Sequence, residues 1–244
     1  MGKKAACVGV LWLACMAASL QATTVILGDP PMLGTGNCDP FGCPGFFGLG
    51  TYQQVYMSSA FPGTIDIEGL TFYEGQVTHN GGLPATGTYT LSFSYTSFDP
   101  GGLNLASPAN NIGTGSETFF TGALPALTPE GSGAWLVIDG TPFVYNPADG
   151  NLLLTVTYSG SANPPNALYL NTPQCGPQTY CPSGTPVVTG SAYFGTSGNG
   201  GNYDGGLVTG FDYAPAVGTP EPASLLLTLA GIGVVGYFYK RRSA

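Results

Sequence analysis

The sequence predicts an all-β protein, an antiparallel β-sandwich of jelly-roll type. Apolar and polar residues alternate with a period of two along several short segments, a pattern typical of strands with one buried and one solvated face. Turn-forming stretches such as NGG, DPGG and NPADG separate these segments. The 39 Gly and 21 Pro residues would fit a disordered chain, but 13 Phe and 14 Tyr residues supply the aromatic side chains of a core. One folded domain of many short strands follows.

The clearest strands are two long alternating segments. Within residues 87–97, the apolar residues face one way and the intervening Thr and Ser residues face the other; the apolar residues are Tyr89, Leu91, Phe93 and Tyr95. Residues 151–160 follow the same rule, and no segment of this region has a clear helical period. The shorter candidate strands also lie between turn formers; they are Val25–Leu27, Thr51–Met57, Thr64–Ile67, Leu70–Tyr73, Glu117–Phe120, Ala134–Ile138, Phe143–Tyr145, Ala167–Leu170, Pro186–Thr189, Ala192–Phe194 and Leu207–Tyr213.

Both ends of the chain are predicted to be targeting segments. Lys3 and Lys4 precede an apolar run and then small residues, which is typical of a secretory signal peptide over residues 1–22, cleaved near Ala22. Residues 223–239 form an apolar run of about 25 Å as a helix, at the short end of what spans a bilayer. The basic cluster behind this transmembrane helix is expected to stay in the cytoplasm, with the preceding domain outside. It consists of Lys240, Arg241 and Arg242.

The tail also contains a G-x-G-x-x-G motif at Gly231, Gly233 and Gly236. A dinucleotide-binding fingerprint would follow a strand, open a helix and lead to an acidic residue about 20 positions later. Here the motif lies within the apolar run, and no acidic residue follows it. We therefore interpret its small residues as permitting close helix packing in lipid.

The tail as a whole, residues 219–244, has three parts in a specific order. Pro220, Glu221 and Pro222 precede the apolar helix and the basic cluster. This order resembles the PEP-CTERM sorting signal of Gram-negative bacteria that produce exopolysaccharide. The resemblance implies that an exosortase, a membrane cysteine transpeptidase-like enzyme, recognises the tail and cuts near Pro-Glu-Pro during export. It also implies transient anchoring in the inner membrane and delivery to the cell surface or the extracellular matrix.

A second stretch is similar to ectodomains that carry such tails. It runs through FFTGALP at residues 119–125 and continues over residues 135–160. The resemblance implies no particular activity, because sorting tails are attached to unrelated domains. It supports only the prediction of a sandwich ectodomain over residues 23–218.

The distribution of charge excludes several functions. The formal net charge is −8, and all five basic residues lie at the ends, so residues 5–239 contain neither Lys nor Arg. Nucleic-acid binding, which needs cations against the phosphates, is therefore excluded for the ectodomain. Phosphate clamps and Schiff-base lysines are excluded for the same reason. Cations such as Ca²⁺ and neutral sugars remain as ligands.

Four cysteines remain once the predicted signal peptide is removed. In an exported protein, an even number of cysteines in Pro- and Gly-rich loops favours disulfides, with three connectivities open. The sequence favours local pairs within GNCDPFGCPG and PQCGPQTYCPSG, and a Cys₄ zinc site is the alternative, although its usual pairs are more closely spaced. The four are Cys38, Cys43, Cys175 and Cys181.

Few residues could support catalysis. His79 is the only histidine, and nothing near it resembles a nucleophile elbow, so we interpret it as a surface turn residue. A glycosidase would need two carboxylates, but we interpret the Glu residues as solvated charges and expect no enzyme. Trp135 lies in an apolar strand and is interpreted as core rather than as a platform for sugars. The candidate proton donors are Glu68, Glu74, Glu117 and Glu130.

Two oxygen-rich loops could bind Ca²⁺. Neither matches a complete calcium loop with its terminal bidentate Glu, and turn chemistry explains both. No cofactor is therefore expected, with calcium as the alternative. The candidate ligands are Asn199, Asn202 and Asp204 in one loop, and Asn146, Asp149 and Asn151 in the other.

The sequence thus predicts an exported protein with a structural or adhesive role, sorted by an exosortase. Its expected partners are the exosortase, exopolysaccharide and, before processing, the membrane. The alternative is a lectin-like carbohydrate-binding module, and a glycoside hydrolase is the remaining hypothesis.

Overall fold

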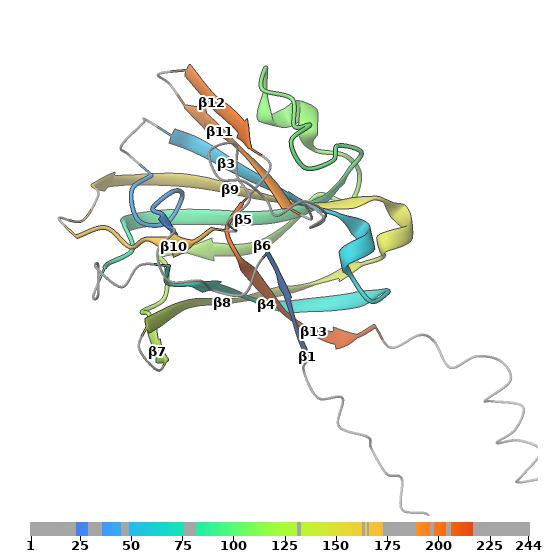
Figure 1. Cartoon of the computed structure of the whole chain (residues 1–244), viewed down its shortest axis with the longest axis horizontal. Helices are drawn as coiled ribbons and strands as arrows, with labels where there is room; N and C mark the ends of the chain where they lie inside the picture. Colours follow the sequence, from blue (N-terminus) through green and yellow to red (C-terminus); the bar gives the residue numbers. More distant parts are fainter. Residues whose placement is uncertain are drawn as a thin grey trace, which may run out of the picture.

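Two antiparallel sheets face each other across a hydrophobic core in the computed structural model (Figure 1). A two-stranded ribbon and three short 3₁₀ helices complete the described part of the chain. The predicted all-β, antiparallel class is confirmed, whereas jelly-roll topology stays a prediction. The structure describes residues 23–28, 36–44, 49–75, 82–130, 133–162, 164, 166–172, 189–195, 198–203 and 206–216.

The strand order differs between the two sheets. The first sheet has the order β1 (Thr23–Leu27), β13 (Thr209–Pro215), β4 (Ile65–Tyr73), β8 (Gly133–Tyr145) and β7 (Thr128–Glu130). The second has the order β12 (Gly198–Tyr203), β11 (Thr189–Gly195), β3 (Leu49–Tyr56), β9 (Asn151–Ala162), β5 (Thr86–Thr96) and β6 (Glu117–Gly122). The ribbon pairs β2 (Gly36–Asn37) with β10 (Leu170–Asn171), and the 3₁₀ helices are η1 (Ser58–Ala60), η3 (Pro108–Asn111) and η4 (Pro147–Asp149). Because β6 also contacts β8, the sheets curl towards a half-barrel on that side.

The alternation predicted for residues 87–97 is confirmed in β5. Tyr89, Leu91 and Phe93 are fully buried in the core between the sheets. Full burial of a large apolar side chain stabilises a fold by roughly 1.5–3 kcal/mol relative to exposure, so these positions help to fix which face of β5 points inward.

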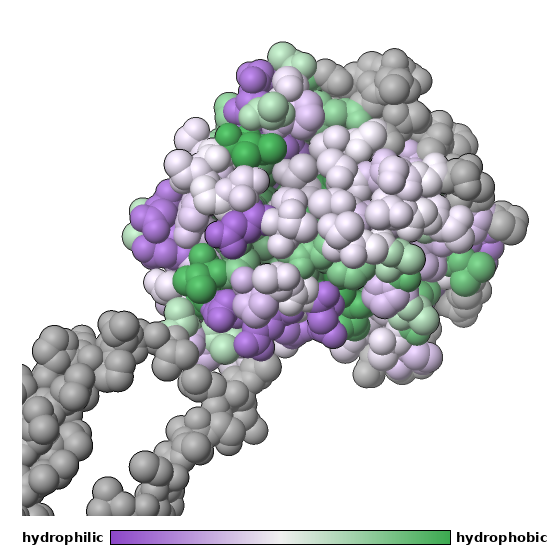
Figure 2. Space-filling view, turned by 180° about the vertical axis from the view of Figure 1, so that it is seen from behind, coloured by the Kyte–Doolittle hydropathy of each residue, from purple (hydrophilic) through white to green (hydrophobic). Residues whose placement is uncertain are grey.

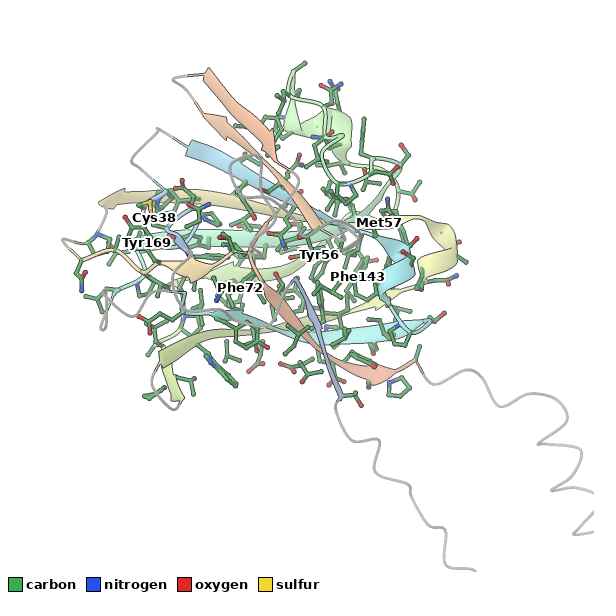
Figure 3. The ribbon with its side chains drawn as sticks, viewed as in Figure 1. Cys38, Tyr56, Met57, Phe72, Phe143 and Tyr169 are labelled. Carbon is green, nitrogen blue, oxygen red and sulfur yellow. A yellow bond between two sulfur atoms is a disulfide. The ribbon has the colours of Figure 1, made fainter. Side chains whose placement is uncertain are left out.

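Aromatic rings fill much of this core. Phe61 packs edge-on against Tyr145 and Phe211, with ring centroids 4.8 and 5.3 Å apart. Figure 3 shows Tyr56 and Phe72 between the two sheets, and both are fully buried. The abundance of Phe and Tyr in a chain rich in Gly and Pro is thus explained by one continuous core.

Two pairs of predicted strands merge into single long strands. The predicted strands Thr64–Ile67 and Leu70–Tyr73 are one strand, β4, and the predicted Ala134–Ile138 and Phe143–Tyr145 are one strand, β8. The turns predicted between them are therefore wrong. The register instead shifts between Ile67, which pairs with Phe143, and Gly69, which pairs with Asp139. The extra residues form an irregularity within a continuous ladder, and turn-like residues are common at such positions.

The prediction of an oxygen-rich loop at the Gly- and Asn-rich stretch around Asn199 and Asn202 is wrong for residues 198–203. The stretch contains β12, which pairs with β11 from Ser191 opposite Tyr203 to Gly195 opposite Gly198. Backbone pairing with β11 makes this stretch a strand, although its residues have low β-propensity.

Two adjacent glutamines in β3 form hydrogen bonds on opposite faces of the second sheet. The Gln53 Nε2 donates to the Pro108 carbonyl oxygen at 3.0 Å, and the Asn111 Nδ2 donates to Gln53 Oε1 at 2.8 Å. The Gln54 Nε2 faces inward and donates to the Leu207 carbonyl oxygen at 2.8 Å. Both glutamines are fully buried, and these bonds offset the cost of burying their amides.

The Gln53 contacts hold the segment of residues 97–116 against the outer face of the second sheet. A small apolar cluster lies beneath it, including Val55, Leu153 and Leu103. Leu153 is therefore buried even though its neighbours Leu152 and Leu154 point into the main core. Residues 97–116 thus cover the part of this outer face around Gln53 and Leu153.

Candidate functional site

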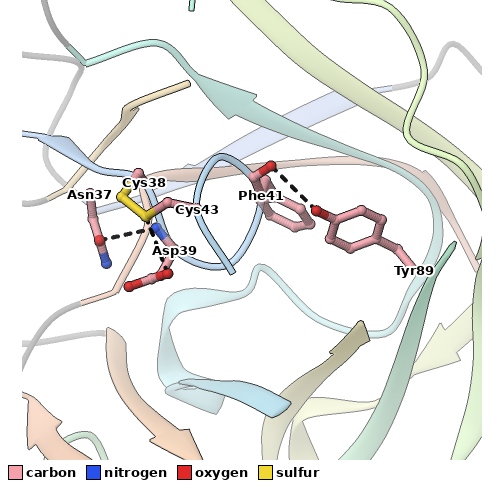
Figure 4. Close-up of a disulfide and its surroundings, with 6 residues drawn as sticks. All are labelled: Asn37, Cys38, Asp39, Phe41, Cys43 and Tyr89. Atoms are coloured by element: carbon pink, nitrogen blue, oxygen red, sulfur yellow. Dashed lines mark hydrogen bonds between the residues drawn. A yellow bond between two sulfur atoms is a disulfide. The ribbon is translucent and has the colours of Figure 1, made fainter. Parts of the chain in front are cut away.

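A disulfide closes the loop between β2 and residue 44. Cys38 is bonded to Cys43, so the first of the two predicted local pairs is confirmed (Figure 4). Because these two sulfurs are bonded to each other, a Cys₄ zinc site is excluded in this state. Cys175 and Cys181 lie outside the described residues, and their pairing stays a prediction.

The disulfide loop is anchored in the core. Phe41 is fully buried and packs against Phe72 with ring centroids 4.8 Å apart. Its carbonyl oxygen accepts hydrogen bonds from the Ala85 backbone N–H at 2.7 Å and from the Tyr89 hydroxyl at 3.4 Å. The loop is therefore held by the sandwich as well as by its own disulfide.

Asp39 is the unusual residue of this loop. Its side chain is only 5% exposed, and burial raises the pKa of its carboxyl from 3.8 to about 7. Its Oδ1 atom lies 3.4 Å from Cys43 Sγ. Since a disulfide sulfur carries no hydrogen, this is a close contact rather than a hydrogen bond. Cys38, Asp39 and Cys43 cluster closely enough to suggest a metal site, but the disulfide leaves no thiolate to act as a ligand.

A second candidate region is the outer face of the first sheet, here called the open face. The register places Thr24, Asp212, Gly69 and Asp139 in one row across β1, β13, β4 and β8. Because paired residues of an antiparallel sheet share a face, their side chains point the same way. Asp212 accepts hydrogen bonds from the hydroxyls of Thr24 and Thr71.

Gly69 leaves a gap between two carboxylates in this row. A Cβ atom placed on Gly69 would lie 3.3 Å from both Asp139 Oδ1 and Asp212 Oδ2. The two carboxylates therefore converge over bare backbone. With no Lys or Arg in residues 5–239, no cationic Lys or Arg of the ectodomain can neutralise them, and they can accept hydrogen bonds from a ligand.

An aromatic pair lies beside this row. Trp135 packs edge-on against Tyr73, its partner on β4, with ring centroids 5.2 Å apart. Trp135 is half-buried and shares the outward face of β8 with Asp139, so the structure places it outside the main core in which we expected it. Tyr73 is almost fully buried, and burial together with the nearby charge of Asp212 raises its pKa.

The open face also carries exposed apolar side chains. Ile26 on β1 is 46% exposed and Val144 on β8 is 58% exposed. On the side of the molecule seen in Figure 2, hydrophobic residues form small patches between hydrophilic ones. The view thus shows a mixed surface rather than one large apolar patch.

The Glu residues singled out in the sequence are dispersed. Glu68 is exposed at the irregularity in β4, and Glu117 is exposed on β6. Glu74 is half-buried and forms an isolated bridge with Leu170. Glu130 ends β7, where its backbone pairs with Gly133. His79 lies outside the described residues.

The candidate calcium loop around Asn146 uses side-chain oxygens for hydrogen bonds within the fold. Asn146 Oδ1 accepts from the Ala148 N–H at 3.2 Å, and Asn146 Nδ2 donates to Asp149 Oδ2 at 3.0 Å. Asn151 Oδ1 accepts from the Ser58 N–H at 2.8 Å. The predicted turn chemistry is therefore present. In the other candidate calcium loop, the backbones of Asn199 and Asn202 belong to β12, and Asp204 lies outside the described residues.

Sequence reasoning missed the acidic residues that the fold makes distinctive. Asp39 could have been noticed from its position between two cysteines that are predicted to pair. Asp139 and Asp212 are 73 positions apart in the chain and meet only through the register of β8, β4 and β13. No local signal could have found that pair.

Comparison with known families identifies the tail. Residues 219–243 match the family described as the PEP-CTERM protein-sorting motif. These residues are a PEP-CTERM sorting motif. The motif marks the protein as exported and as a substrate of an exosortase. No curated protein and no solved structure matches the chain.

The sorting motif contains every tail residue singled out in the sequence. Pro220, Glu221 and Pro222 lie at its start and Lys240, Arg241 and Arg242 at its end, all outside the described residues. Within the part of the chain that the structure describes, no helix is long and apolar enough to cross a bilayer. The transmembrane helix over residues 223–239 and the signal peptide over residues 1–22 therefore stay predictions.

The fold brings the end of the predicted signal peptide close to the segment that leads into the sorting motif. Thr23, which opens β1, pairs with Tyr213 near the end of β13. The sorting motif begins four residues after Pro215, the last residue of β13. At no more than about 3.6 Å per residue, the motif starts within about 15 Å of this edge of the sandwich.

Proposed function

We propose that the exported protein is a non-enzymatic, adhesive component of the cell surface or of an exopolysaccharide matrix. In this proposal it contacts polysaccharide through the open face. The supporting observation is the convergence of Asp139 and Asp212 over Gly69. Carboxylates accept strong, charge-assisted hydrogen bonds, and sugar hydroxyls are suitable donors.

Trp135 supports an extended ligand rather than a single sugar. It lies four residues from Asp139 on the same face of β8, about 13 Å along the strand. One pyranose ring is too short to contact both residues, whereas an oligosaccharide segment can. The half-buried indole offers an apolar surface against which a sugar ring can pack.

The charge distribution favours a neutral polysaccharide. The open face carries Asp139 and Asp212, and residues 5–239 contain no Lys or Arg that could bind a uronate or a sulfate. An acidic polysaccharide would be repelled at low ionic strength, since like charges are then weakly screened.

The proposal is tested by retention of the processed protein on an insoluble neutral glucan and on an acidic polysaccharide. We expect retention on the neutral polymer alone. Asp139→Asn should weaken it about tenfold, because hydrogen bonds to a charged group contribute about 1.5–3 kcal/mol. Trp135→Ala should weaken it similarly.

The matched control is Glu117→Gln, which also removes one exposed negative charge but lies on β6 of the other sheet. It should bind as the wild type does. No retention of the wild type on any neutral polysaccharide would contradict the proposal, as would equal losses in Asp139→Asn and Glu117→Gln.

A further inference from the structure

The disulfide loop places a buried carboxyl group beside one of its two sulfurs. Asp39 Oδ1 lies 3.4 Å from Cys43 Sγ, and neither residue is more than 5% exposed (Figure 4). Cys38 at the other end of the disulfide is half-buried. The two sulfurs are therefore unequal: a reagent in solution reaches Cys38 more readily than Cys43.

The loop has contacts that do not depend on the disulfide. The Cys43 N–H donates to the Cys38 carbonyl oxygen at 2.9 Å, and the Phe41 carbonyl oxygen is held by Ala85 and Tyr89. The Asp39 N–H donates to Asn37 Oδ1 at 3.1 Å. We therefore expect these bonds to keep Asp39 next to Cys43 when both cysteines are reduced.

Closing a disulfide requires a thiolate, because the thiol itself is a poor nucleophile. Burial in apolar surroundings disfavours a thiolate and keeps solvent bases away. Cys43 therefore needs a proton acceptor within the fold, whereas Cys38 can lose its proton to water. Asp39 is the carboxyl in contact with Cys43.

We propose that Asp39 is the proton acceptor that activates Cys43 when the Cys38–Cys43 disulfide forms in the exported chain. The oxidant is a disulfide, either of a small thiol or of a protein. The thiolate of Cys38 first attacks this disulfide, which forms a mixed disulfide and releases one thiolate of the oxidant. The Cys43 thiol then gives its proton to Asp39, and its thiolate attacks Cys38 Sγ. The second thiolate of the oxidant leaves and takes up a proton, so two cysteine thiols are oxidised and one oxidant disulfide becomes two thiols.

The titration of Asp39 suits this role. Burial raises the pKa of its carboxyl to about 7, so it can both accept and release a proton near neutral pH. Titratable groups on the described segments packed against the loop include Tyr89 on β5, Tyr73 next to Phe72 on β4, Tyr169 beside Leu168, and Glu74, whose backbone bridges to Leu170. Burial is the cause of the Asp39 shift.

The test follows disulfide closure in the full-length chain, purified in detergent and reduced. Oxidised glutathione is the oxidant, and peptide mass spectrometry follows Cys38 and Cys43 separately from the other cysteines. At pH 7, Asp39→Asn should close this disulfide at least about tenfold more slowly than the wild type, with glutathione accumulating on Cys38. Asp149→Asn, which removes an exposed carboxylate on η4, should close at the wild-type rate.

The pH profile of the wild type tests the proposal without a variant. With Asp39 as the base, the rate of the second step should level off above about pH 7.5. Simple thiol ionisation would instead raise it about tenfold per pH unit up to the ordinary cysteine pKa of about 8.5. Such a continuous rise would overturn the proposal, as would wild-type closure kinetics in a folded Asp39→Asn variant.

Discussion

Between pH 3 and pH 8, the free energy of unfolding of the wild type is expected to fall by about 4 kcal/mol because of Asp39. The Asp39→Asn variant should not show this fall. The pKa of Asp39 is 3.8 in the unfolded chain and about 7 in the folded one, because burial disfavours the charged form. Between these values the folded state keeps a proton that the unfolded state has released. The free energy of unfolding therefore falls as the pH rises through this range and is constant above it. Each pKa unit corresponds to 1.36 kcal/mol.

The measurement is urea unfolding of the wild type and Asp39→Asn at several pH values. The difference between the two chains should change with pH as described, and Asp149→Asn, with its exposed carboxyl, should run parallel to the wild type. A difference between wild type and Asp39→Asn that is independent of pH would show that Asp39 titrates normally in the folded state.

The absence of Lys and Arg from residues 5–239 should also favour stability in mild acid. Acid usually destabilises proteins by protonating carboxylates that form ion pairs in the folded state. In this ectodomain no carboxylate can pair with a Lys or Arg of the domain itself. We therefore expect the sandwich to tolerate mild acid, and the Asp39 contribution makes it more stable there.

The Gly42→Ala substitution should lower the free energy of unfolding by about 3 kcal/mol. A Cβ atom at Gly42 would lie 2.0 Å from the carbonyl oxygen of Leu168, a backbone atom that no side-chain rotation can move away. The disulfide loop would have to shift, and buried Phe41 would shift with it.

Gly50→Ala is the matched control for this prediction. Gly50 lies in β3, and a Cβ atom there would meet nothing within 4 Å. The substitution should be neutral or stabilise by up to about 1 kcal/mol through the unfolded state. Thermal unfolding of both variants compares the effects, and equal melting temperatures would contradict the packing described for the loop.

The sequence was sufficient for the strands whose pattern is set by one buried face. β5 follows its alternating residues because Tyr89, Leu91 and Phe93 all point into the core. The sequence pattern was not sufficient where contacts with distant strands or segments determine the local structure. Whether Glu68 and Gly69 form a turn or an irregularity depends on β8, about 70 residues further along the chain. The burial of Gln53 likewise depends on residues 97–116, which cover that face.

Some features of the candidate site could also be predicted from local sequence patterns, and others could not. The pairing of Cys38 with Cys43 follows from short spacing in a Pro- and Gly-rich loop, and the sorting motif follows from three consecutive sequence features. The convergence of Asp139 and Asp212 depends on register across three strands, which single-sequence patterns do not contain.

Export and exosortase processing should separate this sandwich from its sorting motif. The most direct test is the intact mass of the protein recovered from outside the inner membrane of its native host. We expect a chain that ends near Pro220–Pro222, lacks Lys240–Arg242 and begins near Thr23, with its mass reduced accordingly. Recovery of only the uncut 244-residue chain, retained in the inner membrane, would contradict the account.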